Sequence, residues 1–230
     1  MGRHSNACVK HVYEQQPVSR AKAHQGELMT TDEQSIRDRI FLAALACIER
    51  DGLDSMTVRS IASEAQVNTA AINYYFGTKA RLVEQVLTRT LREGLDGSLD
   101  ELEELIATKA GDINAALREF VSIFLGQMVN WPRLAEAQIH DALTQQDYDS
   151  PAIIAMNGFL ARFLEIVRPI LPERTEDQQR TAVLQFWLPM IFLGILPRGF
   201  ENFGRTEVLN PEWREAYVSR LLDVLLETSA

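Results

Sequence analysis

The sequence predicts an all-α protein, with an N-terminal three-helix head followed by a larger helical body and about nine helices in all. Apolar residues recur at helical spacing along most of residues 31–230, without strand-type alternation or a strand–helix–strand rhythm. Good helix-capping residues stand directly before these apolar stretches. The 230 residues are 46% apolar, which is enough for a sizeable core in one or two domains.

The negative charge of the chain is unevenly distributed. The net charge is −9. Residues 1–30 hold four basic and two acidic side chains, residues 31–90 seven and eight, and residues 91–230 twelve and twenty-two. A DNA partner would therefore be bound through a local patch in the first part and repelled by the rest, which favours specific over bulk binding.

Composition and motifs speak against several classes of protein. Cys8 and Cys47 are far apart and do not suggest a disulfide framework, so we expect a cytoplasmic protein. No segment has the pattern of a signal peptide, and the apolar stretch 183–197 is shorter than the roughly 20 residues of a membrane helix. Nucleophile-elbow, phosphate-loop, His-Glu-x-x-His and Cys-x-x-Cys motifs are absent, so we expect no enzyme and no cofactor.

Three regions follow from these patterns: a tail over residues 1–30, a head over residues 31–80 and a body over residues 81–230. The tail is polar and lacks periodicity, so we expect it to be disordered and basic. A start of the native protein at Met29 is one alternative. An arm that reaches the DNA minor groove with Arg20 and Lys22 is another.

The first predicted helix covers residues 32–50, and Gly52 closes it. Cys47 lies near its apolar stripe, and because no cation is predicted beside it, we interpret it as a small core residue rather than a reactive thiol. The stripe itself consists of Ile36, Ile40, Phe41, Ala44, Leu45 and Ile48.

Residues 57–76 predict two short helices joined by a tight turn. Thr57 is a suitable N-cap for the first helix, and Asn68 for the second, over residues 69–75. Gly77 ends the second helix, and Thr78 caps the next one. Two helices joined by a turn of three to four residues form the frame that places a recognition helix in the DNA major groove.

The outward face of the second helix has the chemistry of a base-reading surface, whereas Ala71, Ile72 and Phe76 suit its inner side. Asparagine bonds adenine, threonine and alanine contact a thymine methyl, and tyrosine or lysine suits phosphate oxygens. The candidates for groove contact are Thr69, Ala70, Asn73 and Tyr74. Thr57, Arg59 and Asn68 at the helix starts, with Tyr75, Lys79 and Arg37 for phosphates, complete the expected DNA-binding set.

These residues also stand at the spacing of a known family. With Thr57, Ile61-Ala62, Ala65, Val67-Asn68, Ile72-Asn73, Tyr75-Phe76, Thr78-Lys79 and Leu82, residues 32–90 resemble the DNA-binding domain of the TetR family of bacterial regulators. Gln66, Asn68 and Asn73 replace the usual glycine, serine and tyrosine, although Asn-Tyr-x-Phe-Gly-(Ser/Thr)-Lys occurs in a subset of the family. Gln66 indicates a turn that avoids a positive φ or tolerates one at some cost.

The body is helical by pattern. Further helices are expected from Thr78, Asp112, Pro132, Pro151, Thr175 and Pro211. Gly94 and Gly97 are expected to break or bend the first of these helices, and Pro189 to bend the penultimate one. The acidic side chains of residues 100–104 are interpreted as a solvated face.

Apolar and aromatic residues of the middle helices have two interpretations. Singly, each is ordinary core. The resemblance implies a cavity for an apolar or aromatic inducer among them. His140 has Glu136 one turn before it, but two ligands do not make a metal site. The ligand candidates are Phe120, Phe124, Gln127, Met128, Trp131, His140, Met156, Phe159 and Phe163.

The apolar segment 183–196 and the last helix are too hydrophobic for one-sided surface helices. Both suit an internal core, but the resemblance implies a four-helix interface with two helices from each subunit of a homodimer. The interface candidates are Phe186, Trp187, Met190, Leu193, Tyr217, Leu221 and Leu225.

The combined expectation is a sequence-specific regulator without a membrane segment, a homodimer that represses from a palindromic operator and is released by a small hydrophobic effector. A DNA-binding regulator whose aromatic body serves only packing or a protein partner is the first alternative. A helical enzyme with an incidental helix-turn-helix is the second.

Overall fold

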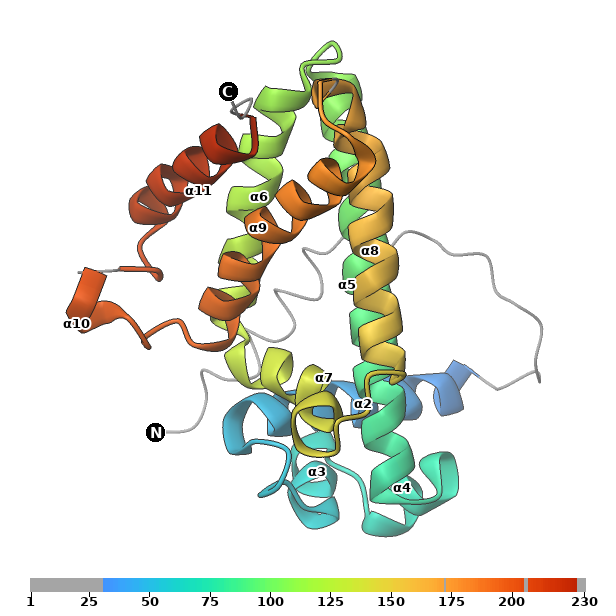
Figure 1. The fold of residues 1–230 in the computed structure, drawn as a ribbon. Coiled ribbons are helices and arrows are strands. Elements are labelled where there is room, and N and C mark those ends of the chain that lie inside the picture. The colour runs from blue at the N-terminus through green and yellow to red at the C-terminus, as the bar shows by residue number, and fades with distance from the viewer. Residues whose placement is uncertain (1–30, 172, 205–206, 227–230) are drawn as a thin grey trace. The chain divides into compact units, whose positions relative to one another are not determined.

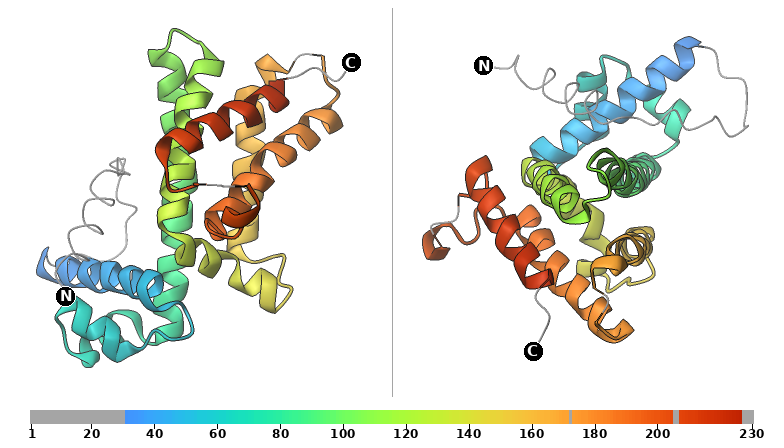
Figure 2. Two further views of the ribbon diagram at one scale, coloured as in Figure 1. Left: turned by 90° about the vertical axis from the view of Figure 1, so that its left-hand side faces the viewer. Right: turned by 90° about the horizontal axis from the view of Figure 1, so that it is seen from above.

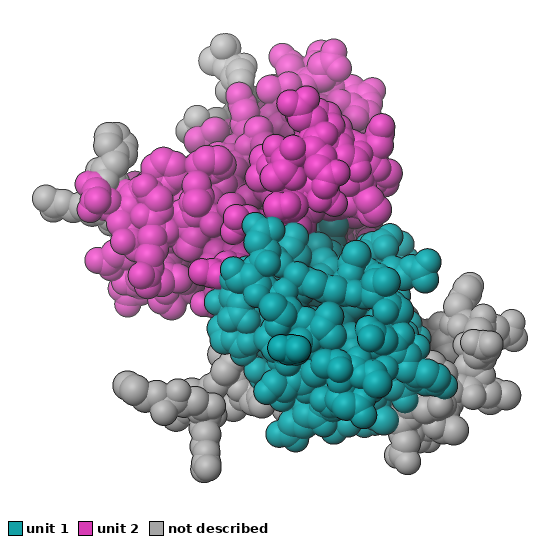
Figure 3. Space-filling model, turned by 90° about the horizontal axis from the view of Figure 1, so that it is seen from below, with its two compact units in different colours: residues 1–93 teal, residues 94–230 magenta. Residues whose placement is uncertain are grey.

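Two compact helical units, residues 1–93 and 94–230, make up the computed structural model (Figures 1 and 3). The structure describes residues 31–171, 173–204 and 207–226, so the expected tail lies outside the described residues. In these ranges every regular element is a helix, which confirms the predicted fold class. Within the described part of the chain, nine helices have at least eight residues; α10 (Glu201–Gly204) and the 3-10 helix η1 (Arg168–Ile170) are shorter. Among these helices none combines the length and hydropathy that a membrane crossing requires.

The first unit contains α2 (Thr31–Asp51), α3 (Val58–Ala65), α4 (Thr69–Phe76) and the beginning of α5 (Lys79–Thr108) (Figure 1). The predicted stripe of α2 is buried along its length, except that Ile36 is half-buried. Apolar side chains from the other three helices complete this core: Ile61, Ala62, Ala65, Ile72, Phe76, Leu82 and Val86.

The boundary between the units falls within α5, after Glu93, and therefore later than the expected head–body boundary at residue 80. Leu82 and Val86 are fully buried, and the Arg89 guanidinium lies 4.6 Å from the centre of the Phe41 ring on α2. The first turns of α5 are thus part of the first unit. The helix also runs through Gly94 and Gly97 without the expected break, because single glycines cost a helix only about 1 kcal/mol each.

The second unit contains the rest of α5, α6 (Ile113–Asn130), α7 (Pro132–Thr144), α8 (Pro151–Val167), α9 (Glu176–Ile195) and α11 (Pro211–Leu226) (Figure 2). Helices α6, α9 and α11 pack against one another, and α8 packs on α9. The predicted cap at Asp112 is confirmed, since its side chain accepts from the backbone N–H of Ala115. The helix expected from Thr175 begins with Thr175 as its N-cap. Asp100 and Glu103 of the acidic stretch pair with Arg162 on α8 at 2.7 and 2.9 Å.

Helices α6 and α9 approach closely at Gly194, and this contact predicts a stability effect. A Cβ atom added there would lie 2.6 Å from Cε and 3.0 Å from Cβ of Met128. Because the Met128 Cβ atom cannot move without its helix, Gly194→Ala is expected to lower the free energy of unfolding by about 1–3 kcal/mol. Denaturant unfolding followed by circular dichroism measures this loss.

Gly158 on α8 is the matched control, because a Cβ atom added to it meets nothing within 4 Å. Gly158→Ala is therefore expected to raise the free energy of unfolding by about 0.5–1 kcal/mol through its better helix propensity. If both alanine variants stabilised the protein equally, the close approach at Gly194 would be contradicted.

Candidate functional site

Helices α3 and α4 form a capped helix-turn-helix in the first unit. The Thr57 hydroxyl accepts from the backbone N–H of Ser60, and the Ser60 hydroxyl accepts from the backbone N–H of Thr57, both at 3.0 Å. The Asn68 side chain accepts from the backbone N–H of Ala71 at 2.8 Å. Both predicted N-caps are confirmed, and three residues, 66–68, separate the two helices.

The turn tolerates a positive φ rather than avoiding it. Gln66 has a left-handed backbone with φ of 55° and ψ of 44°. Its N–H donates to the carbonyl of Ser63 at 3.3 Å, and the Val67 N–H donates to that of Ala62 at 3.0 Å. These two bonds make a Schellman motif, for which glycine is the preferred left-handed residue.

Gln66→Gly is therefore expected to stabilise the protein by about 0.5–1 kcal/mol, since glycine adopts the left-handed conformation without a Cβ clash. The midpoint of thermal unfolding measures this gain. Ser63→Gly, at an exposed helical position of α3, is the control and is expected to lower the midpoint. A lower midpoint for Gln66→Gly would show that the turn is not strained.

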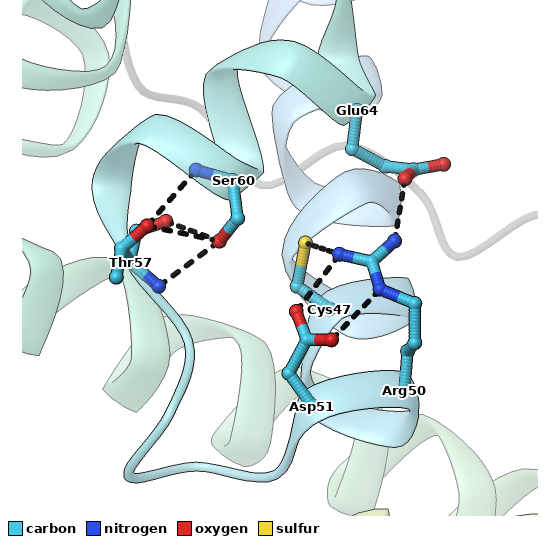
Figure 4. A network of polar contacts seen from close by, with 6 residues as sticks. All are labelled: Cys47, Arg50, Asp51, Thr57, Ser60 and Glu64. Atoms are coloured by element: carbon cyan, nitrogen blue, oxygen red, sulfur yellow. Dashed lines mark hydrogen bonds and ion pairs between the residues drawn. The ribbon is translucent and has the colours of Figure 1, made fainter.

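Arg50 on α2 forms an ion pair with Glu64 on α3 and so connects the two helices (Figure 4). Its guanidinium pairs with Asp51 and with Glu64 at 2.8 Å each and donates to the Cys47 sulfur at 3.4 Å. The bonds to Asp51 and then Glu64 raise the pKa of Arg50. The expectation that no cation stands beside Cys47 is wrong, because Arg50 lies one helical turn further along α2. Burial still raises the pKa of the Cys47 thiol against the opposing effect of Arg50.

The predicted base-reading residues share the exposed surface of α4. Thr69, Ala70, Asn73 and Tyr74 are exposed, whereas Ile72 and Phe76 on the inner side are buried. Tyr74 is 76% exposed. Its ring stands edge to face with that of the half-buried Tyr75, at a centroid distance of 5.0 Å. Thr57, Arg59 and Asn68 are also exposed.

Two of the expected phosphate ligands have partners within the first unit. The Lys79 ammonium donates to the carbonyl of Leu53 at 3.4 Å. The Arg37 guanidinium donates to Gln85 at 3.1 Å and lies 5.5 Å from the centre of the Phe76 ring. Sequence spacing could not identify these partners because they come from distant turns of the fold.

Arg37 also lines an open groove of about 820 Å³ beside α2 and α5. The walls of this groove carry both signs of charge, including Asp38, Glu84, Arg81 and Arg89. It is therefore no simple anion site. Arg81 is exposed in the first turn of α5 and is a phosphate candidate that the expected DNA-binding set omitted.

An aromatic cluster lies in the core of the second unit. The Trp187 ring is surrounded edge to face by Phe124, Phe159, Phe163 and Phe186, at centroid distances of 4.9–5.5 Å. The Trp187 Nε1 atom is buried and has no hydrogen-bond partner among the described residues. Leaving a buried donor unsatisfied costs about 1–3 kcal/mol, so its retention requires an explanation.

The other ligand candidates are spread over differing environments. Phe120 is buried and stacks at a tilt on Phe124 at 5.8 Å, and Met128 packs near Gly194. Gln127 is exposed, whereas Trp131, His140 and Met156 are half-buried. No group of three or more His, Cys, Asp and Glu side chains in the described part of the chain could hold a metal ion.

Five of the seven expected interface residues need correction. Phe186, Trp187, Met190, Leu193 and Leu225 are buried in the core of the second unit, and Tyr217 and Leu221 pack against that core. The opposite side of α9 carries a different apolar row, defined by Leu184, Leu188 and Phe192. We call these three residues the α9 row. Helix α9 is apolar on both faces, so periodicity alone could not say which face is outward.

The comparisons with known proteins agree with this geometry. Residues 40–86 match the family described as bacterial regulatory proteins, tetR family. The chain is 28% identical over 139 residues to the transcriptional repressor NicS of Pseudomonas putida, which covers 59% of this chain and 61% of that protein. It is 31% identical over 101 residues to the nicotine-responsive repressor HdnoR of Paenarthrobacter nicotinovorans, covering 41% and 46%. The chain thus spans less than two thirds of either relative.

A solved structure shares the fold at low sequence identity. A TetR family transcription regulator from Marinobacter aquaeolei superposes with a TM-score of 0.62 at 18% identity. The superposition covers 85% of this chain and 98% of that one.

Proposed function

We propose, from its DNA-binding motif and its fold, that the chain is a TetR-family regulator and that it is a repressor. As a homodimer it binds a palindromic operator in the cytoplasm, and a small apolar or aromatic effector releases it. The observation that carries this proposal is the capped helix-turn-helix with its exposed polar face on α4.

The α4 face supplies the reading chemistry. In this proposal Asn73 bonds an adenine edge, and the Thr69 methyl and Ala70 contact a thymine methyl. Tyr74 and Tyr75 add hydroxyl groups that suit phosphates, and Arg59 and Arg81 add exposed cations. Because the excess of negative charge lies in residues 91–230, non-specific contacts between DNA and the second unit are disfavoured.

The α9 row is the proposed dimer contact. Its members are 44–58% exposed and recur every four residues, so they lie along one face of the helix. Val224 on α11 is a further exposed apolar residue, at 58%. A second copy of the chain is the occupant that a two-fold symmetric operator requires, because each half-site takes one recognition helix.

The proposed effector acts through the second unit. Its aromatic cluster suits an apolar or aromatic molecule, and the relative HdnoR is described as nicotine-responsive. Helix α5 contributes residues to both units, so an effector that favours one arrangement of the second unit can change the spacing of the two recognition helices. This is a population shift, and its size is limited by the difference in effector affinity between the two states.

Selection of bound DNA from a random pool at near-physiological salt tests the proposal. The expected result is an enriched palindrome with half-sites one helical turn apart. If no sequence is enriched before or after the protein is unfolded and refolded to remove a bound effector, the protein is not a sequence reader. Salt-sensitive binding to all DNA sequences alike would also show that the protein does not read a sequence.

A further inference from the structure

Trp187 places an indole N–H inside an otherwise apolar cluster. The residue is 1% exposed, and its Nε1 atom has no hydrogen-bond partner in the described part of the chain. Four phenylalanine rings surround it in edge-to-face contacts. Packing alone would be served by another hydrocarbon ring, which would not bury an unsatisfied donor. A ligand that supplies the missing acceptor accounts for the tryptophan.

We propose that the effector is a flat, neutral aromatic molecule with one hydrogen-bond acceptor, and that Trp187 Nε1–H donates to this acceptor. The regulatory role of this ligand rests on the proposed repressor function, whereas the binding site at Trp187 does not. The side chains around Trp187 determine the charge of the ligand. The rings around Trp187 are phenylalanines, and no charged side chain is buried among the described residues, so an ionised ligand would lose its hydration without gaining a counter-charge.

Phe124 is the ring that has to move to admit the ligand. It is half-buried, whereas Phe159, Phe163 and Phe186 are buried. Its α6 neighbour one turn on is the half-buried Met128, whose unbranched side chain adapts easily to a new occupant. The route to Trp187 therefore passes the α6 side of the cluster.

Two probes of equal size and shape separate the effect of the hydrogen-bond acceptor from that of the aromatic rings. Quinoline carries a ring nitrogen that accepts a hydrogen bond, and naphthalene does not. Heteronuclear spectra of the full chain with ¹⁵N-labelled indoles resolve its three tryptophans, and Trp187→Phe assigns the resonance. Saturating quinoline is expected to move the Trp187 indole proton downfield, with a larger shift than naphthalene causes. An unmoved resonance, or equal shifts with the two probes, would overturn the proposal.

The affinities of both probes for the wild type and for Trp187→Phe form a thermodynamic cycle that isolates the hydrogen bond. The substitution is expected to weaken quinoline binding about tenfold more than naphthalene binding, the value of one hydrogen bond to a formerly unsatisfied donor. Trp213→Phe on α11 is the matched control and should affect both probes alike. Equal losses for the two probes in Trp187→Phe would contradict the donor role. If that variant does not fold, Trp131→Phe and Trp213→Phe assign the Trp187 resonance by elimination, and the wild-type spectra decide.

Operator release is measured separately, so that the two proposals can fail independently. If quinoline moves the Trp187 resonance without releasing selected operator DNA, the site stands and the effector role in the proposed function falls. If quinoline releases the DNA while the Trp187 resonance stays unmoved, the proposed function stands and this site is overturned.

Discussion

Leu188→Glu is expected to convert the proposed dimer to monomers and to weaken operator binding by at least about 100-fold, because the second recognition helix no longer binds as part of the same molecule. Leu188 is 58% exposed at the centre of the α9 row. A carboxylate there is solvated in the monomer, but it would be buried without a partner in an apolar interface. Sedimentation velocity measures the change in mass, and a mobility-shift titration measures the affinity.

Ile154→Glu is the matched control for this substitution. Ile154 is 62% exposed on α8, outside the α9 row, so its replacement should leave both mass and operator affinity unchanged. Circular dichroism shows that both variants are folded. If Leu188→Glu remained a dimer with wild-type affinity, the α9 row would not be the interface.

The parts of the fold that depend on local chemistry could be predicted from the sequence. Thr57, Asn68 and Asp112 cap their helices as expected, because a side-chain oxygen at an N-cap needs only the amides of the next turn. The inner and outer faces of α4 also followed from its spacing, since Ile72 and Phe76 are four residues apart and both buried.

Features that depend on distant partners could not be predicted. Lys79 stands at a helix start, where a cation suits phosphate, yet its ammonium donates to a carbonyl 26 residues earlier in the chain. Trp187 and Leu188 are adjacent and both apolar, and only tertiary packing places the first in the core and the second on the surface. The same ambiguity affects the aromatic residues, because a ligand site and a core use the same side chains.

Asn73→Ala is expected to weaken binding to the selected operator by about 1–3 kcal/mol, which is roughly 5- to 150-fold, and to relax specificity at one base pair in each half-site. Asn73 is exposed on α4, and its amide is the group on that face that matches the paired donor and acceptor of adenine. Titration against operators with each base substituted in turn measures both effects. The loss should be confined to operators that carry the preferred base.

Arg59→Ala separates base reading from backbone binding. Arg59 is exposed on α3, so its loss is expected to weaken all sequences alike and to reduce the salt dependence of binding by about one phosphate contact. Asn114→Ala, at an exposed position of α6 in the other unit, should change neither quantity. If Asn73→Ala instead weakened every operator variant equally, Asn73 would be a backbone contact, and base specificity would have to come from Thr69, Ala70 and Tyr74.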